Sequence, residues 1–270
     1  MKLPTRVDWK TLFLMTVMYA VLLGNFWLYR NRPLPLFLHI LLSAAAIHCA
    51  FTIWHEAVHN NVSDQGWFNN LIGILGMFPY MTPYFIEKWI HLKHHAKLNQ
   101  PDDPNQVYVS GPFWQLPLRY FRGLFYVKSL LKEDRLTPKE RVWDTISVVA
   151  ILAIYFNAWL HGFLKDLVLL WTLPWIFAKV MLDWYINYIP HVGLPADNYK
   201  GTRIIDLAWF TPFVLNHNYH AVHHLWPRYP WHQYVTVFKQ SVDKLKKYGV
   251  PIERRIFGFK PKRAKELEPV

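Results

Sequence analysis

The 270-residue sequence has a single cysteine, few charges and few glycines, and each shortage excludes a class of protein. Cys49 has no partner within the chain, which excludes a scaffold held by internal disulfides. Only 18% of the residues are charged and 53% are hydrophobic, a balance that excludes intrinsic disorder and is rare in soluble proteins. The 11 glycines form no GxGxxG motif after a strand-like segment, so no flavin or nicotinamide fingerprint is present.

Long uncharged runs are what the sequence has in abundance. Three uncharged runs, residues 11–29, 33–54 and 145–164, are each long enough to cross a hydrocarbon core of about 30 Å as a helix. A fourth apolar run, residues 167–190, is also long enough but is interrupted by Pro174, Lys179 and Asp183. The first run is too long for a signal peptide and is followed by no small-x-small cleavage site, so we expect it to be retained. The sequence therefore predicts an all-α integral membrane protein with about four transmembrane helices.

A fifth run, residues 67–86, is uncharged but is interrupted by asparagines and by Pro79 and Pro83. This composition is typical of a re-entrant or interfacial segment rather than a span. The histidine motifs on either side of it, described below, must share one side of the membrane if they share metals. We therefore expect the segment not to cross.

The distribution of Lys and Arg predicts the orientation. With the four spans above, one side of the membrane collects 26 Lys and Arg, whereas the other side has three. Because cytoplasmic loops are enriched in these residues, both termini and a histidine-rich cap are expected to be cytoplasmic.

We expect a single membrane domain over residues 1–238, followed by a basic tail over 239–270. Between Lys239 and Lys265 the tail has ten basic and two acidic residues. Such a tail favours attachment to anionic lipid headgroups or docking of an acidic electron carrier, and nucleic acid is not an expected partner.

The chain has 14 histidines, and eight of them fall into three clusters. His55 and His59 are four residues apart, which places both on one face of a helix. The other two clusters both read HxxHH, and they comprise His91, His94, His95, His220, His223 and His224. Eight imidazoles suit two metal ions with about four ligands each, more than one zinc ion requires. Imidazole alone does not choose among iron, copper, nickel and zinc.

Several polar residues lie at spacings that would let them support these ligands. His191 is a ninth ligand candidate, and helical spacing places Asp183 and Asn187 near it. Ligating histidines usually donate their second N–H to a carboxylate or carbonyl. The acidic candidates for that role are Glu56, Glu87, Asp102 and Asp103.

His55-Glu56-Ala57-Val58-His59 also matches HExxH, the motif of zinc proteases in which the glutamate is the general base. A membrane zinc protease is therefore one alternative, but it leaves both HxxHH clusters without a role. A metal-binding or transport protein without catalytic activity is another.

Taken together, the three histidine motifs in this order resemble those of the membrane fatty acid desaturase/hydroxylase superfamily. Within it, two segments are similar to cyanobacterial-type β-carotene hydroxylases: HLKHHAKLNQPDDP at 91–104, and NYHAVHHLWP at 218–227 followed by Pro230 and Trp231. The sequence departs from that subfamily at Glu56, where aspartate is commoner. The resemblance covers about two thirds of the chain.

The resemblance implies a non-haem di-iron centre held by His55, His59, His91, His94, His95, His191, His220, His223 and His224, with Asn187 as a water-mediated contact. Such enzymes use O₂ and two external electrons to attack an unactivated C–H bond. Since the chain has no cofactor motif for redox chemistry, a ferredoxin or similar separate donor is implied.

The activity expected first is hydroxylation of the ring of β-carotene. Desaturation of a fatty acyl chain, which the same ligands serve, is the alternative. The sequence assigns no separate acid or base and no substrate-binding residue.

Overall fold

The computed structural model describes residues 6–119 and 135–260. The described chain is mostly helical, with two strands of two residues each. It divides into two compact units. Unit 1 comprises Met1–Trp89 and Leu136–Lys179, and unit 2 comprises Ile90–Arg135 and Val180–Val270.

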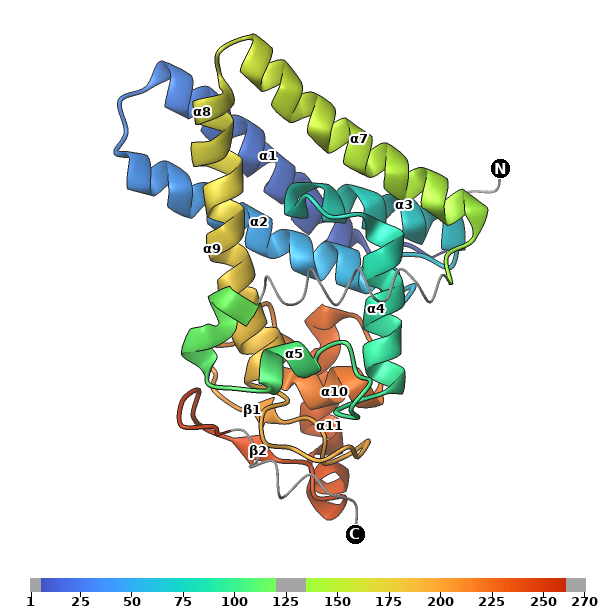
Figure 1. The fold of residues 1–270 in the computed structure, drawn as a ribbon. Coiled ribbons are helices and arrows are strands. Elements are labelled where there is room, and N and C mark those ends of the chain that lie inside the picture. Colours follow the sequence, from blue (N-terminus) through green and yellow to red (C-terminus); the bar gives the residue numbers. More distant parts are fainter. Residues whose placement is uncertain (1–5, 120–134, 261–270) are drawn as a thin grey trace. The chain divides into compact units, whose positions relative to one another are not determined.

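Unit 1 is built from long apolar helices. Figure 1 shows two of them, α1 and α2, running side by side in blue. Its elements are α1 (Trp9–Asn31), α2 (Leu36–Val58), α3 (Gly66–Met77), η1 (Phe78–Tyr80), α7 (Pro138–Leu160), α8 (Leu164–Leu167) and the π-helical turn η3 (Val168–Thr172). Two further helices, α4 (Tyr84–Ala96) and α9 (Leu173–Leu182), begin in unit 1 and end in unit 2.

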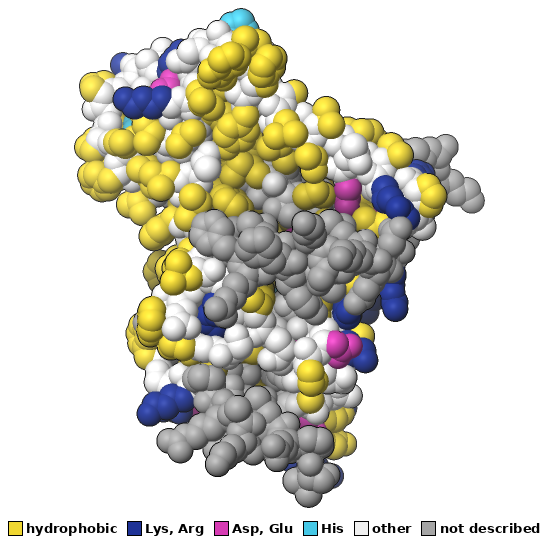
Figure 2. All heavy atoms as spheres, viewed as in Figure 1, with side chains coloured by type: hydrophobic (Ala, Val, Ile, Leu, Met, Phe, Trp, Pro, Cys, Tyr) yellow, Lys and Arg dark blue, Asp and Glu magenta, His cyan; other side chains and the backbone are white. Residues whose placement is uncertain are grey.

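The prediction of four spans is confirmed. Four helices in the described residues are long and apolar enough to cross a membrane, at Trp9–Asn31, Leu36–Val58, Pro138–Leu160 and Leu164–Tyr188. Figure 2 shows hydrophobic side chains covering much of the visible surface of these helices in unit 1. Phe13, Leu152 and Trp159, for example, are each at least 62% exposed. Apolar side chains left on the outside of a helix are stable when lipid surrounds them.

Two helix boundaries differ from the predicted ones. The third helix begins at Pro138, seven residues before the uncharged run, because Thr137 and Glu140 form a reciprocal capping box. The fourth begins at Leu164, three residues before the predicted run, and continues through Pro174. The π-helical turn η3 immediately before this proline shifts the backbone pairing locally.

The segment 67–86 forms two short elements and a turn instead of a span. Its main helix, α3, has 12 residues, which is too short to cross. The chain then turns at Met81, which has a positive φ of 55°, before α4 begins. Trp171 Nε1 donates a hydrogen bond of 2.8 Å to the carbonyl of Pro79, and this bond holds the turn against the fourth helix.

The start of α4 is capped from another helix. Asp144 on α7 accepts hydrogen bonds from the backbone N–H groups of Phe85 and Ile86, both at 2.9 Å. These N–H groups belong to the first turn of α4, where no intrahelical acceptor exists. The buried carboxylate therefore fixes the start of α4 within unit 1.

Close packing of α3 on α2 depends on Gly76. A Cβ at this position would lie 2.9 Å from the backbone nitrogen of Trp54. We expect Gly76→Ala to destabilise the protein by about 1–3 kcal/mol, because backbone atoms cannot move aside as a flexible side chain can. Thermal unfolding in detergent measures the change. Gly24→Ala on α1, where a Cβ would meet nothing within 4 Å, is the control, and equal melting temperatures for the two variants would contradict the prediction.

Unit 2 is built from short helices around a small core. Its further elements are α5 (Gln106–Val109), η2 (Phe113–Gln115), the π-helical η4 (Asp183–Tyr188), β1 (Ile204–Ile205), η5 (His217–Tyr219), α10 (His220–Leu225), η6 (Trp231–Gln233), α11 (Tyr234–Lys247) and β2 (Ile252–Glu253). The two strands pair in parallel. The core residues include Ile204, Val222, Tyr234, Phe238 and Leu245.

The first part of the expected basic tail is folded. Position 239 falls inside α11, and β2 adds to the edge of β1. The tail beyond residue 260 lies outside the described residues. The expectation of a single domain over residues 1–238 stays a prediction.

Candidate metal centre

Four histidines of unit 2 meet in one cluster, which we call the four-histidine cluster. Its members are His94 on α4, His191 just after η4, and His220 and His224 on α10. One nitrogen from each ring lies within 4.8 Å of those of the others. The closest approaches join the Nε2 atom of His220 to the Nε2 atoms of His191, at 2.9 Å, and of His224, at 3.0 Å.

These nitrogens are suited to a metal ion. Burial, with further contributions from neighbouring histidines, holds the pKa values of His191, His220 and His224 well below 6.5. The rings are therefore neutral, the form of imidazole that binds metals. Within the described residues, the buried Nε2 atom of His94 has no hydrogen-bond partner. A cation at this point would satisfy nitrogens that otherwise face one another.

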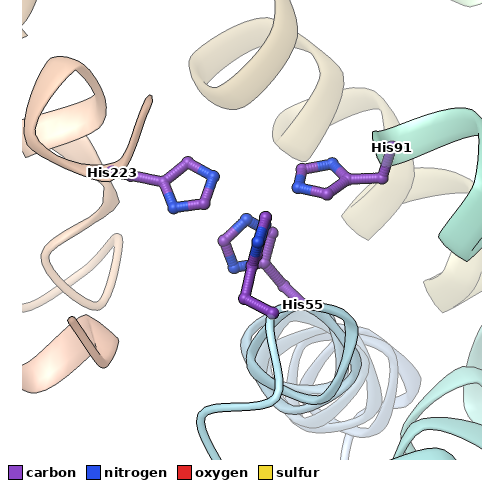
Figure 3. Close-up of side chains that lie close together, drawn as sticks. His55, His91 and His223 are labelled. Atoms are coloured by element: carbon purple, nitrogen blue, oxygen red, sulfur yellow. The ribbon is translucent and has the colours of Figure 1, made fainter. Parts of the chain in front are cut away.

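A second cluster lies directly beside the first in unit 2, and we call it the three-histidine cluster. It consists of His91 and His95 on α4 and His223 on α10. The Nε2 atom of His95 is 3.1 Å from that of His91 and 2.8 Å from that of His223. Figure 3 shows the rings of His91 and His223, whose centroids are 5.8 Å apart. His95 stacks on His224 of the four-histidine cluster, with the ring centroids 4.2 Å apart.

Each HxxHH motif contributes to both clusters. On α4, His91 and His95 are one turn apart and enter the three-histidine cluster, whereas His94 enters the four-histidine cluster. On α10 the division is reversed, because His220 and His224 enter the four-histidine cluster and His223 the other. The spacing of both motifs thus produces two adjacent sites.

The remaining two predicted ligands belong to unit 1. His55 and His59 lie at the carboxyl end of α2, with ring centroids 5.0 Å apart (His55 is labelled in Figure 3). Phe51 stacks on the His55 ring, one turn earlier in the helix. The Nδ1 atom of His55 is 3.6 Å from an oxygen of Glu56. The role of His55 and His59 as ligands stays a prediction.

Of the acidic residues predicted to support ligands, Asp103 contacts one directly. Its carboxylate, buried in unit 2, accepts a hydrogen bond from the Nδ1 atom of His94 at 2.9 Å. It also accepts the backbone N–H groups of Asn99 and Asn105, each at 2.8 Å. This bond places the proton of His94 on Nδ1 and leaves the Nε2 lone pair directed at the four-histidine cluster.

The other predicted support residues have different surroundings. Asp102 lies at the surface, 3.4 Å from Lys97. The buried carboxylate of Glu56 accepts a hydrogen bond of 3.0 Å from the Nδ2 atom of Asn61. Glu87 lies on α4, one turn before the first histidine of that helix, and its role stays a prediction.

Asp183 and Asn187 share one side of the π-helical η4, as their spacing suggested. Asn187 donates a hydrogen bond of 3.0 Å to Asp183 and accepts one of 2.9 Å from Asn105. Asn105 in turn donates its backbone N–H to Asp103. Asn187 is therefore joined to the support of His94, while its water-mediated contact to a metal stays a prediction.

Two residues that sequence analysis missed also hold the ligands. The hydroxyl of Tyr234 and the Nδ1 atom of His223 share a hydrogen bond of 3.1 Å. Arg203 donates hydrogen bonds to the backbone carbonyls of Ile189 and Val192, which lie on either side of His191 in the sequence. Burial lowers the pKa of Arg203 to about 10, and the guanidinium remains charged at neutral pH. No sequence motif marks either residue, because each one contacts a segment that is not adjacent to it in the sequence.

The fatty acid desaturase family model matches residues 31–255 of the chain. The chain is 27% identical over 139 residues to an sn-1 oleoyl-lipid 12-desaturase of Picosynechococcus, an alignment covering 51% of this chain and 38% of the relative. It is 25% identical over 254 residues to the chloroplastic omega-6 fatty acid desaturase of Brassica napus, covering 82% of this chain and 57% of the relative.

A third relative is the sn-1 acyl-lipid omega-3 desaturase (ferredoxin) of Nostoc, which is 22% identical over 227 residues, covering 70% of this chain and 62% of that protein. The chain thus spans between 38 and 62% of the length of these three relatives. The family model matches most of the sequence. This match agrees with the histidine motifs and with the four membrane-spanning helices. The chain belongs to the fatty acid desaturase family.

Proposed function

We propose that the protein is a membrane di-iron oxidoreductase that uses O₂ to introduce a double bond into an acyl chain of a membrane lipid. The observation that supports this most strongly is the pair of adjacent histidine clusters in unit 2, whose nitrogens are buried or partly buried and directed at one another. Membership of the fatty acid desaturase family supports iron as the metal and an acyl lipid as the substrate.

The ligands that we propose are the nine histidines of the motifs. His94, His191, His220 and His224 would hold one ion, and His91, His95 and His223 would contribute to the second. His55 and His59 complete the proposed set. Iron in such a site would supply the activation of O₂. The protein's own part is to keep the buried imidazoles neutral, through burial, and to orient the ligands, through Asp103, Tyr234 and the carbonyl contacts of Arg203.

The balance of the proposed reaction requires an external reductant. Reduction of O₂ to two water molecules takes four electrons and four protons. Formation of one C=C bond from two CH₂ groups releases two of each. The remaining two electrons must come from a separate donor, and the printed name of the Nostoc relative includes ferredoxin. We propose a ferredoxin or similar protein as the donor.

We further propose that the histidine clusters and both termini face the cytoplasm, as the distribution of Lys and Arg predicts. The apolar helices of unit 1 give the protein its place in the bilayer, where acyl chains are abundant. A hydrophobic substrate would then reach the metals from the membrane, whereas the electron donor would approach from water.

Hydroxylation of the β-carotene ring, which the sequence favoured first, becomes the second candidate. The relatives described above are by name acyl-lipid or fatty acid desaturases, and the comparisons give the carotenoid activity no support. The observation that favours carotenoid hydroxylation as a second candidate is the similarity of the segments 91–104 and 218–227 to carotenoid hydroxylases. The hypothesis of an HExxH zinc protease is disfavoured, because it leaves both histidine clusters of unit 2 without a role.

A product profile distinguishes these activities. The protein would be co-expressed with a ferredoxin and its reductase in a host that accumulates β-carotene, and acyl lipids and pigments would be analysed by mass spectrometry. Acyl chains lighter by two hydrogens are the expected result. Carotenoids heavier by one or two oxygens, with unchanged acyl chains, would replace the proposal by its second candidate. Unchanged profiles of both, with iron bound, would contradict it.

A further inference from the structure

We propose that the exposed lysine face of α11 is the surface on which an acidic one-electron carrier protein docks. This inference rests on the proposed function, because only an enzyme that receives electrons from outside needs such a partner. It goes beyond that function by assigning the partner to one helix. The lysine face is defined by Lys239, Lys244, Lys246 and Lys247.

The two faces of α11 differ sharply in character. One face is buried in the core of unit 2 through Tyr234, Val237, Phe238 and Leu245. The opposite face is exposed and carries Lys239, Lys246 and Lys247, with Asp243 as its single acidic residue, and Lys244 is exposed at the edge of this face. Lys239, Lys246 and Lys247 form no ion pair with any described residue. All three side chains are exposed on the described part of the chain.

Neighbouring segments extend the positive surface. The side chain of Lys200 lies beside Gly249, just after the helix, where a Cβ would be 3.2 Å from its Cε atom. Arg254 and Arg255 follow and are exposed. From residue 234 to 260 the chain has seven basic residues and two acidic ones. A surface of one sign attracts a partner of the opposite sign and speeds their encounter.

The same helix reaches the metal ligands. Tyr234, its first residue, is hydrogen-bonded to His223. Lys239 follows five residues later, which is about 8 Å along the helix axis at 1.5 Å per residue. Lys244 lies over the ring of Trp226, 5.6 Å from its centroid, and Trp226 is two residues after His224. A carrier bound to the lysine face would thus lie close to both histidine clusters.

Anionic lipid headgroups are the other partner that a basic helix could bind, and the burial pattern argues against them. A helix that lies on a membrane inserts its apolar face between the lipids. The apolar face of α11 is already occupied by the core of unit 2, and no large hydrophobic residue of Tyr234–Lys247 is among the exposed ones. The helix therefore offers a folded surface that suits a soluble acidic protein.

The test compares two triple variants of the full-length, iron-loaded protein. Lys239→Gln, Lys246→Gln and Lys247→Gln together remove three charges from the lysine face. Lys10→Gln, Lys139→Gln and Lys165→Gln remove three exposed charges elsewhere and are the matched control. The first readout is the Kd for a plant-type [2Fe–2S] ferredoxin, measured at several salt concentrations in vesicles of neutral phosphatidylcholine. This readout does not depend on turnover.

We expect the lysine-face variant to raise the Kd at least tenfold and to weaken its salt dependence, while the control stays within twofold. Turnover supported by ferredoxin should show a matching rise in KM, whereas turnover driven by dithionite and methyl viologen should not change. Equal Kd values for the two triple variants would overturn the docking proposal.

Two further outcomes separate the alternatives. A defect that appears only in vesicles containing phosphatidylglycerol, and with both electron donors, would assign the lysine face to lipid headgroups and overturn the proposal. Absence of turnover in the unmodified protein with either donor would count against the proposed function alone, because the Kd comparison would still decide whether the carrier docks on α11.

Discussion

Replacement of His94 by alanine is expected to abolish turnover while leaving the protein inserted in the membrane. His94 supplies the Nε2 nitrogen that is buried and has no hydrogen-bond partner in the described chain. Its removal would leave three imidazoles in the four-histidine cluster. Iron per chain, measured after reconstitution, should fall from about two to about one, and activity should fall by more than the 10- to 100-fold typical of residues that only support a ligand.

His161→Ala is the matched control for this experiment. His161 is an exposed histidine at the end of α7 and belongs to neither cluster. The control should retain both metal ions and full activity. Full activity in His94→Ala would remove the basis of the ligand assignment, and loss of membrane insertion in that variant would mean that the residue acts on folding instead.

The second large effect is expected from Asp103→Asn. Each carboxylate oxygen of Asp103 accepts one backbone N–H, from Asn105 or from Asn99, as well as facing the Nδ1 atom of His94. An amide in this place would direct its NH₂ group at a partly buried N–H donor in either orientation. Leaving such a donor unsatisfied costs about 1–3 kcal/mol. Metal affinity should also fall 10- to 100-fold, since His94 would lose the partner that orients it.

Asp102→Asn provides the comparison within the same turn. The Asp102 side chain is 52% exposed and only 3.4 Å from Lys97, so its ion pair contributes at most about 1 kcal/mol. Competition with a chelator gives the metal affinity of both variants, and thermal unfolding gives their stability. If Asp103→Asn behaved like Asp102→Asn in both measurements, the orienting role of Asp103 would be wrong.

The sequence predicted the membrane helices well because lipid imposes a simple rule of length and polarity. Residues 11–29 and 33–54 lie within α1 and α2 apart from the first three residues of the second run. The start of the third helix was missed because a capping box, not the end of a charged stretch, determines where a helix begins. An uncharged run predicts what can lie in lipid, and a helix can extend beyond it.

The histidine motifs predicted which residues meet in unit 2 but not how they are divided. Spacing of three and four residues places the rings of one motif on one side of a helix. The contact between His95 and His223 joins positions 128 residues apart, and it depends on how α4 and α10 approach each other. Tyr234 and Arg203 were beyond prediction for the same reason, because their partners are fixed only by the folded chain.

The reversed division of the two HxxHH motifs has a mechanical consequence. Both α4 and α10 carry nitrogens of both clusters, so a rotation or sliding of either helix displaces ligands of both sites at once. Neither site can be opened by moving α4 or α10 while the other site stays closed. The two positions therefore behave as a single cooperative unit, in which order at one favours order at the other.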